Sequence, residues 1–149
     1  MKQAFIFLGV ILIVSFVIVM NSTTACILCT NKNVEPDTRS DIKPIIRSAS
    51  TSEFNSMLNS KDVVLIDIRT PDEFNSGHIN GAMNLDFYSS TFKEELDLLD
   101  KSKTYLIYCR TGSRTGQTLN IMKNLGFSEV YDLSGGIVAW QSNNFPLVT

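Results

Sequence analysis

The chain has 149 residues, with 13 Lys and Arg against 15 Asp and Glu, 44% hydrophobic residues and three Cys. This length fits one domain plus a short additional segment, and the aliphatic content excludes a disordered chain and a small disulfide scaffold. A formal net charge of −2 argues against nucleic acid as a partner, because no basic excess is present to neutralise phosphates.

The chain begins with an apolar segment, because residues 4–20 contain no charged side chain. Its length falls between the apolar part of a signal peptide, roughly 7 to 15 residues, and a membrane-spanning helix of roughly 20. We therefore predict that residues 1–25 are a cleaved signal peptide or an uncleaved membrane anchor. The small polar residues that follow the apolar segment favour cleavage.

Cys26 is a candidate lipidation site. Residues 23–25 before it resemble a relaxed bacterial lipobox, with Thr23 in the place of the usual aliphatic residue. Cys26 and Cys29 form a C-x-x-C, but no βαβ pattern and no second Cys or His pair accompanies them, so we expect neither a redox pair nor a metal site. The prediction is an exported protein of the cell envelope, tethered to the membrane by its N-terminal segment on the periplasmic or extracytoplasmic side.

Residues 26–45 are polar, interrupted by Pro36 and Pro44, and without apolar periodicity. Such a composition is typical of a flexible tether. Residues 46–149 are predicted to form the folded domain.

In that domain, short β-type runs alternate with helical segments. Residues 63–68 and 104–108 are continuous apolar runs typical of buried strands, and residues 82–85 form a weaker one. This alternation is typical of an α/β fold with a parallel sheet covered by helices on both faces.

Helix signals separate these runs. Ser50 and Glu53 have the spacing of a capping box, and Pro71 at a first helical position starts a short helix that Gly77 ends. Residues 92–99 are amphipathic. A longer helix follows later in the chain, with Leu119, Met122 and Leu125 on one face, and ends at Gly126.

The loop Cys109–Arg114 lies between the strand at residues 104–108 and this helix, at the sheet edge where α/β proteins bind ligands. Its amides can form an anion-binding nest, and the helix N-terminus adds partial positive charge. With Arg110 and Arg114 beside it, the Cys109 thiol is predicted to have a lowered pKa and to act as a nucleophile on anionic substrates. The alternative is a small buried hydrophobic residue, which explains neither the Arg pair nor Gly112.

Three segments in order carry a family resemblance: VVLIDIRTPDEFNSGHINGAMNL at 63–85, YCRTGSR at 108–114 and LSGGIVAW at 133–140. They resemble the single-domain rhodaneses, a sulfurtransferase family. The resemblance implies a rhodanese-like five-stranded parallel sheet with helices on both faces. It also implies a catalytic cysteine, Cys109, that carries sulfur as a persulfide, within a sulfur-binding loop of Arg110, Thr111, Gly112, Ser113 and Arg114.

The loop has the form C-x4-R, whereas related phosphatases have C-x5-R with room for a tetrahedral phosphate. The shorter loop favours a sulfurtransferase that takes sulfur from a small anionic donor such as thiosulfate and passes it to cyanide or a thiol. Two other interpretations stay open: a phosphatase or arsenate-reductase-like enzyme, and a non-catalytic rhodanese-like binding module.

Individual side chains receive more specific predictions. Arg110 is expected to point outward and steer the donor, while Arg114 either binds the donor or pairs with a carboxylate that fixes the loop. Asp67 and Arg69 border the pocket, or Asp67 accepts hydrogen bonds from neighbouring amides. His78, the only histidine, is expected to serve packing rather than chemistry.

The last motif has structural expectations. Gly135 and Gly136 are expected to allow a close backbone approach or a positive φ, and Trp140 to pack on the core. The sequence contains no nucleotide-binding glycine loop and no metal-binding cluster, so we expect no cofactor and no metal.

Overall fold

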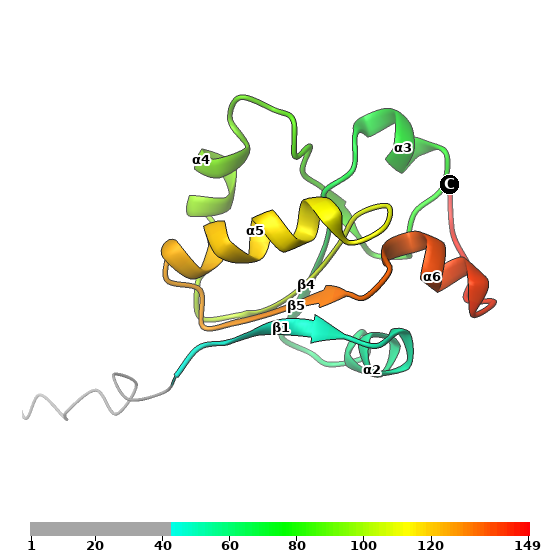
Figure 1. Ribbon diagram of the computed structural model, residues 1–149, viewed down its shortest axis with the longest axis horizontal. Coiled ribbons are helices and arrows are strands. Elements are labelled where there is room, and N and C mark those ends of the chain that lie inside the picture. Colours follow the sequence, from blue (N-terminus) through cyan, green and yellow to red (C-terminus); the bar gives the residue numbers. More distant parts are fainter. Residues whose placement is uncertain (1–42) are drawn as a thin grey trace, which may run out of the picture. The chain divides into compact units, whose positions relative to one another are not determined.

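The computed structural model describes residues 43–149, which contain a five-stranded sheet with helices around it (Figure 1). The expected signal peptide or anchor, Cys26 and nearly all of the expected tether lie outside the described residues. The first strand begins at Ile45, the residue at which the tether was expected to end. No helix within residues 43–149 is long and apolar enough to cross a membrane.

The sheet is entirely parallel and has the strand order β1-β5-β4-β2-β3. Its strands are β1 (Ile45–Ala49), β2 (Val63–Asp67), β3 (Met83–Asn84), β4 (Thr104–Tyr108) and β5 (Glu129–Leu133). The predicted α/β fold with a five-stranded parallel sheet is therefore confirmed. The two strongly apolar runs form β2 and β4, and the weaker run contains the two-residue β3.

The helices are α2 (Thr51–Met57), α3 (Pro71–Asn75), α4 (Phe92–Asp97), α5 (Ser113–Asn124) and α6 (Gly136–Ser142). The predicted starts of α2 and α3 are confirmed. The Ser50 side chain accepts a hydrogen bond from the Glu53 amide, and Thr70 forms a full capping box with Glu73, with Pro71 in the first turn.

Helices cover both faces of the sheet, as Figure 1 shows. Side chains alternate along each strand, so β4 contributes Tyr105 and Ile107 to one core and Leu106 and Tyr108 to the other. The first core packs against α4 and α5, and the second against α2 and α6. Trp140 is 2% exposed in the second core, which confirms its predicted packing role.

The carboxyl ends of β2, β4 and β5 meet at one edge of the sheet, and the connection after β5 presses against the one after β4. A Cβ on Gly136 would lie 2.5 Å from the carbonyl oxygens of Cys109 and Arg110, and its φ is +62°. The Ile137 amide donates to the Cys109 carbonyl at 2.9 Å. Gly136 therefore meets both predictions for this motif, a close approach and a positive φ.

Candidate active site

Cys109 follows β4 directly and is 1% exposed. Gly112 has a φ of +100°, which turns the loop back so that its amide donates to the Cys109 Sγ at 3.1 Å. The Thr115 hydroxyl lies 3.9 Å from the same sulfur. The sulfur therefore lies inside a ring formed by its own loop and the first turn of α5.

The surroundings of Cys109 act on its pKa in opposite directions. Burial raises the pKa of the thiol, but the backbone amides of Thr115, Gly112, Thr111 and Arg114 favour the anion and leave the pKa below its usual value. A lowered pKa produces the thiolate, which is the nucleophilic form of cysteine. The predicted direction of the shift is confirmed, and its main favourable cause is the set of amides.

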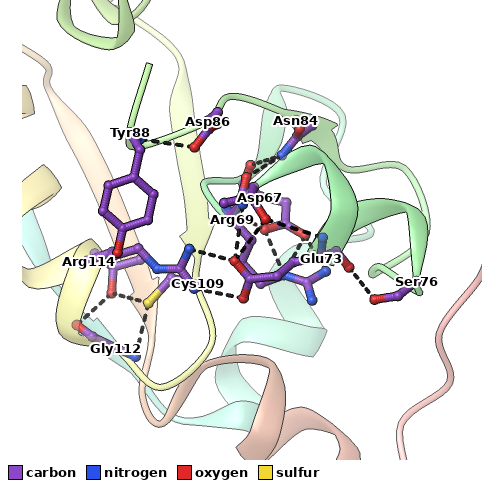
Figure 2. Close-up of polar contacts among 12 residues, drawn as sticks. Asp67, Arg69, Glu73, Ser76, Asn84, Asp86, Tyr88, Cys109, Gly112 and Arg114 are labelled. Carbon is purple, nitrogen blue, oxygen red and sulfur yellow. Dashed lines mark hydrogen bonds and ion pairs between the residues drawn. The ribbon is translucent and has the colours of Figure 1, made fainter. Parts of the chain in front are cut away.

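Arg114 pairs with Glu73 through two hydrogen bonds of 2.8 and 2.9 Å, so its guanidinium is held by a carboxylate of α3 (Figure 2). This geometry corresponds to the second of its two predicted roles, pairing with a carboxylate. Its guanidinium carbon also lies 5.7 Å from the centre of the exposed Tyr88 ring. The Arg114 hydrogen bond, against the opposing effect of burial, lowers the Glu73 pKa to about 2.

The other loop residues are arranged around this pair. Arg110 is exposed, and its side chain makes no ion pair with any residue in the range 43–149. Its carbonyl accepts a hydrogen bond from the Val138 amide at 3.3 Å, which fixes its backbone to α6. Thr111 and Ser113 are exposed and Gly112 is half-buried. Arg110 therefore offers its charge to solvent, as its predicted steering role requires.

Asp67 and Arg69 form a buried pair at the end of β2. The Asp67 carboxylate accepts from both the amide and the guanidinium of Arg69, with a shortest distance of 2.6 Å. Arg69 also donates to the Gly77 carbonyl at 2.7 Å. The predicted hydrogen bond from a neighbouring amide to Asp67 is present, and the pair joins β2 to the turn after α3.

His78 stacks on Phe74, with ring centres 3.8 Å apart, and its backbone bridges to Val148. These contacts agree with its predicted packing role.

Three residues of this region were not identified from the sequence. Glu73 lies in the first turn of α3, and nothing in the sequence distinguished it from the other acids that could pair with Arg114. Thr115 follows the loop directly, but its hydroxyl gave no separate signal. Asp132 lies in β5, which the apolar pattern did not reveal, and it accepts from Thr115 at 3.1 Å.

Comparison with known proteins identifies the family. A family model described as rhodanese-like domain matches residues 50–143. A sulfurtransferase of Allochromatium vinosum is 33% identical over 99 residues, which cover 66% of this chain and 91% of that protein. The thiosulfate sulfurtransferase GlpE of Shewanella oneidensis is 30% identical over 64% of this chain and 92% of its own length. A probable adenylyltransferase/sulfurtransferase, MoeZ of Mycobacterium tuberculosis, is 37% identical, but the match spans only 24% of it.

Solved structures agree. A rhodanese-related protein from Thermoplasma volcanium has a TM-score of 0.61 and 26% identity, and the match covers 68% of this chain and 97% of that one. A protein of unknown function from Rhodopseudomonas palustris, described as a possible tyrosine phosphatase, has a TM-score of 0.58 over 69% of this chain and 85% of its own. At 24% identity, this match shows that the two proteins share a fold and does not show a shared activity. The family match, the relatives and the Cys109 loop lead to one conclusion: this chain belongs to the rhodanese-like domain family.

Proposed function

We propose that this protein is a sulfurtransferase that moves a sulfane sulfur from thiosulfate or a similar anionic donor to a thiophilic acceptor through a persulfide on Cys109. The observation that carries the proposal is the buried Cys109 sulfur within hydrogen-bonding distance of the Gly112 amide, in a loop whose amides lower its pKa. The named sulfurtransferases among its relatives support the same class of reaction.

In the first step, the Cys109 thiolate attacks the outer sulfur of thiosulfate. A bond forms between Sγ and that sulfur, the bond to the sulfonate sulfur breaks, and its electron pair leaves with sulfite. The outer sulfur keeps the negative charge that it carried in thiosulfate, so the new persulfide is an anion, and sulfite leaves with two negative charges. Loop amides already directed at Sγ stabilise this anion in the way that an oxyanion hole does.

In the second step, cyanide or a thiolate attacks the outer sulfur of the persulfide. The sulfur–sulfur bond breaks, its electrons return to Sγ, and thiocyanate or a new persulfide leaves while the Cys109 thiolate is restored. No other cysteine occurs after Cys29, so the acceptor that discharges Cys109 comes from outside the domain.

The positions of the two loop arginines support different tasks in this cycle. Arg110 is exposed and steers the anionic donor to the loop. Arg114 is held by Glu73, so it fixes the first turn of α5 and with it the amides around the sulfur. Thr111 and Gly112 contribute backbone amides to this cradle, and Ser113 begins α5.

A phosphatase on the same scaffold is the main rival, since it would use the same thiolate. A phosphate ester needs space for a tetrahedral group and a guanidinium that binds its oxygens. Here the loop is the shorter C-x4-R, and the Arg114 guanidinium is already paired with the Glu73 carboxylate. Both features favour the sulfur chemistry.

One comparison of activities tests the proposal. Thiocyanate formation from thiosulfate and cyanide is measured beside hydrolysis of p-nitrophenyl phosphate, for the wild-type protein and for Cys109→Ala. We expect thiocyanate from the wild type alone and little ester hydrolysis from either. Ester hydrolysis without thiocyanate would establish the phosphatase, and no turnover of either substrate by the wild type would establish a binding module.

For the N-terminal segment we propose export and attachment to the cell envelope, on the basis of the uncharged residues 4–20 and of Cys26. Mass spectrometry of the mature protein from membrane fractions tests this. A lipid-modified Cys26 or a cleaved N-terminus supports export through a signal peptide, an intact Met1 in the membrane fraction supports an anchor, and an intact Met1 in the soluble fraction would overturn both.

A further inference from the structure

A buried acid that the proposed reaction does not use lies below the Cys109 loop. Asp132 alternates with Tyr131 and Leu133 along β5, so its side chain points to the sheet face that α5 covers. Asp132 is 4% exposed, and its Oδ1 has no hydrogen-bond partner among residues 43–149. Leaving a polar atom buried without a partner costs free energy, so Asp132 calls for an explanation beyond packing.

The Thr115 hydroxyl connects this acid to the reactive sulfur. Its Oγ1 lies 3.1 Å from the Asp132 Oδ2, 2.9 Å from the Gly112 carbonyl oxygen and 3.9 Å from the Cys109 Sγ. A hydroxyl has one hydrogen to donate. Three acceptors therefore compete for it, and the direction in which it points decides whether the sulfur receives a side-chain donor.

We propose that Asp132 is a positioning residue that acts through the Thr115 hydroxyl to withhold this donor from the Cys109 sulfur. A carboxylate accepts hydrogen bonds more strongly than a neutral carbonyl, and the sulfur is the most distant of the three acceptors. The hydrogen bonds to the sulfur anion then come from backbone amides alone.

This restraint has a chemical consequence, which rests on the proposed function of Cys109. Each further donor to a sulfur anion lowers its pKa and also its nucleophilicity. A persulfide that is stabilised too strongly would likewise be slow to release its outer sulfur. Asp132 therefore keeps the balance between loading sulfur and passing it on.

Other titratable groups near Asp132 and Cys109 could also affect the Cys109 pKa, so the variants have to leave them unchanged. In the sheet, the register neighbours of Asp132 are Ser48 on β1 and Ile107 on β4, neither of which titrates. Near Cys109, the charged or titratable groups include Arg110, Arg114 with its partner Glu73 of α3, and Tyr88 beside Arg114. Tyr108 of β4 and the Asp67–Arg69 pair at the end of β2 lie on the neighbouring strands. All of these stay in place in the variants below.

The first variant is Asp132→Asn, which keeps the shape and replaces one oxygen by an NH2 group. This group can donate to the Thr115 Oγ1 and free the hydroxyl hydrogen for the sulfur. The readout is the rate at which iodoacetamide alkylates Cys109 as a function of pH, followed by peptide mass spectrometry so that Cys26 and Cys29 do not interfere. We expect the midpoint to fall by about half a pH unit or more, and the plateau rate at high pH to fall as well.

The second variant, Thr115→Val, removes the hydroxyl with little change in volume. Because the effect runs through this hydroxyl, Asp132→Asn should produce no shift in the Thr115→Val background. Thr115→Ser keeps the hydroxyl and serves as the matched control, in which the shift should persist. Circular dichroism and thermal unfolding check that each variant is folded.

Two results would overturn the proposal: a midpoint in Asp132→Asn that stays or rises, or a fall that persists in the Thr115→Val background. If Thr115→Val does not fold, the direction of the shift in Asp132→Asn decides alone. Alkylation needs no sulfur donor, so the outcome is independent of whether the protein transfers sulfur. Absence of thiocyanate formation together with the expected alkylation profiles would contradict the proposed function and leave the role of Asp132 standing.

Discussion

Two arginine–carboxylate pairs lie near the carboxyl edge of the sheet, and they differ in what they join. Asp67 and Arg69 are two residues apart, with 0% and 6% of their side chains exposed, and they hold the end of β2. Glu73 and Arg114 are 41 residues apart, with 31% and 13% exposed, and they connect α3 to the first turn of α5. The first pair is buried within one segment of the chain, while the second joins two helices and, in the proposed function, holds the Cys109 loop in place.

The largest effect is expected from breaking the buried pair. Asp67→Asn leaves the Arg69 guanidinium buried without a countercharge, which should lower the free energy of unfolding by about 3–5 kcal/mol in urea denaturation. Asp97→Asn, in the exposed pair with Lys101, is the matched control and should change it by less than about 1 kcal/mol. Equal losses in the two variants would show that burial does not distinguish these pairs.

A smaller effect on stability but a larger one on turnover is expected from Glu73→Gln. This variant releases Arg114, so the free energy of unfolding should fall by about 1 to 3 kcal/mol, less than for the fully buried pair because Glu73 is partly exposed. The loop amides should lose their alignment with the Cys109 sulfur, and kcat for thiocyanate formation should fall about tenfold or more.

Glu53→Gln provides the matched control, since Glu53 also lies in the first turn of a helix and pairs with an arginine, Arg47. We expect it to leave kcat unchanged. If both glutamate variants reduced kcat to the same extent, the Glu73–Arg114 pair would have no special connection to the site.

The Glu73–Arg114 pair makes the stability of the protein depend on pH. The pKa of Glu73 is lowered from 4.5 to about 2 in the folded protein, chiefly by its hydrogen bond with Arg114. A lowered folded-state pKa stabilises the protein above the unfolded value, and this stabilisation disappears as the pH falls through the folded value. The difference in unfolding free energy between wild type and Glu73→Gln should be constant above about pH 5.5, and should shrink below pH 4.5 toward its limit near pH 2. A difference that does not change over this range would contradict the ion pair.

The smallest structural effect is expected from Arg110→Ala, because this side chain is exposed and unpaired within residues 43–149. The free energy of unfolding should change by less than about 0.5 kcal/mol. The KM for thiosulfate should rise severalfold and depend less on salt, since a steering charge is removed. Arg110→Lys should retain most of the effect of the charge. An unchanged KM in Arg110→Ala would remove its steering role.

The sequence predicts the features that depend on neighbouring residues. The apolar run at β4, the turn at Gly112 and the start of α5 follow one another in the chain, so the position of Cys109 is predictable. Strands β1 and β5 were not predicted, because polar and charged side chains interrupt their apolar residues, whereas β2 and β4 of the same length lie in continuous apolar runs. Only the family resemblance indicated a sheet of five strands.

Contacts between segments that are distant in the sequence could not be predicted. A carboxylate partner for Arg114 was expected as one of two possibilities, but nothing in its spacing pointed to Glu73 rather than to another acid. The sequence did not indicate a role for Asp132 either, because its hydrogen bond with Thr115 depends on the packing of α5 over β5.

The central claim is that Cys109 accepts a single sulfur atom. The most direct test is the intact mass of the purified protein after incubation with thiosulfate and removal of excess donor, followed by peptide mapping. We expect a gain of about 32 Da on the peptide that contains Cys109, reversed by cyanide and absent in Cys109→Ala. No gain on this peptide, or a gain confined to Cys26 or Cys29, would contradict the account.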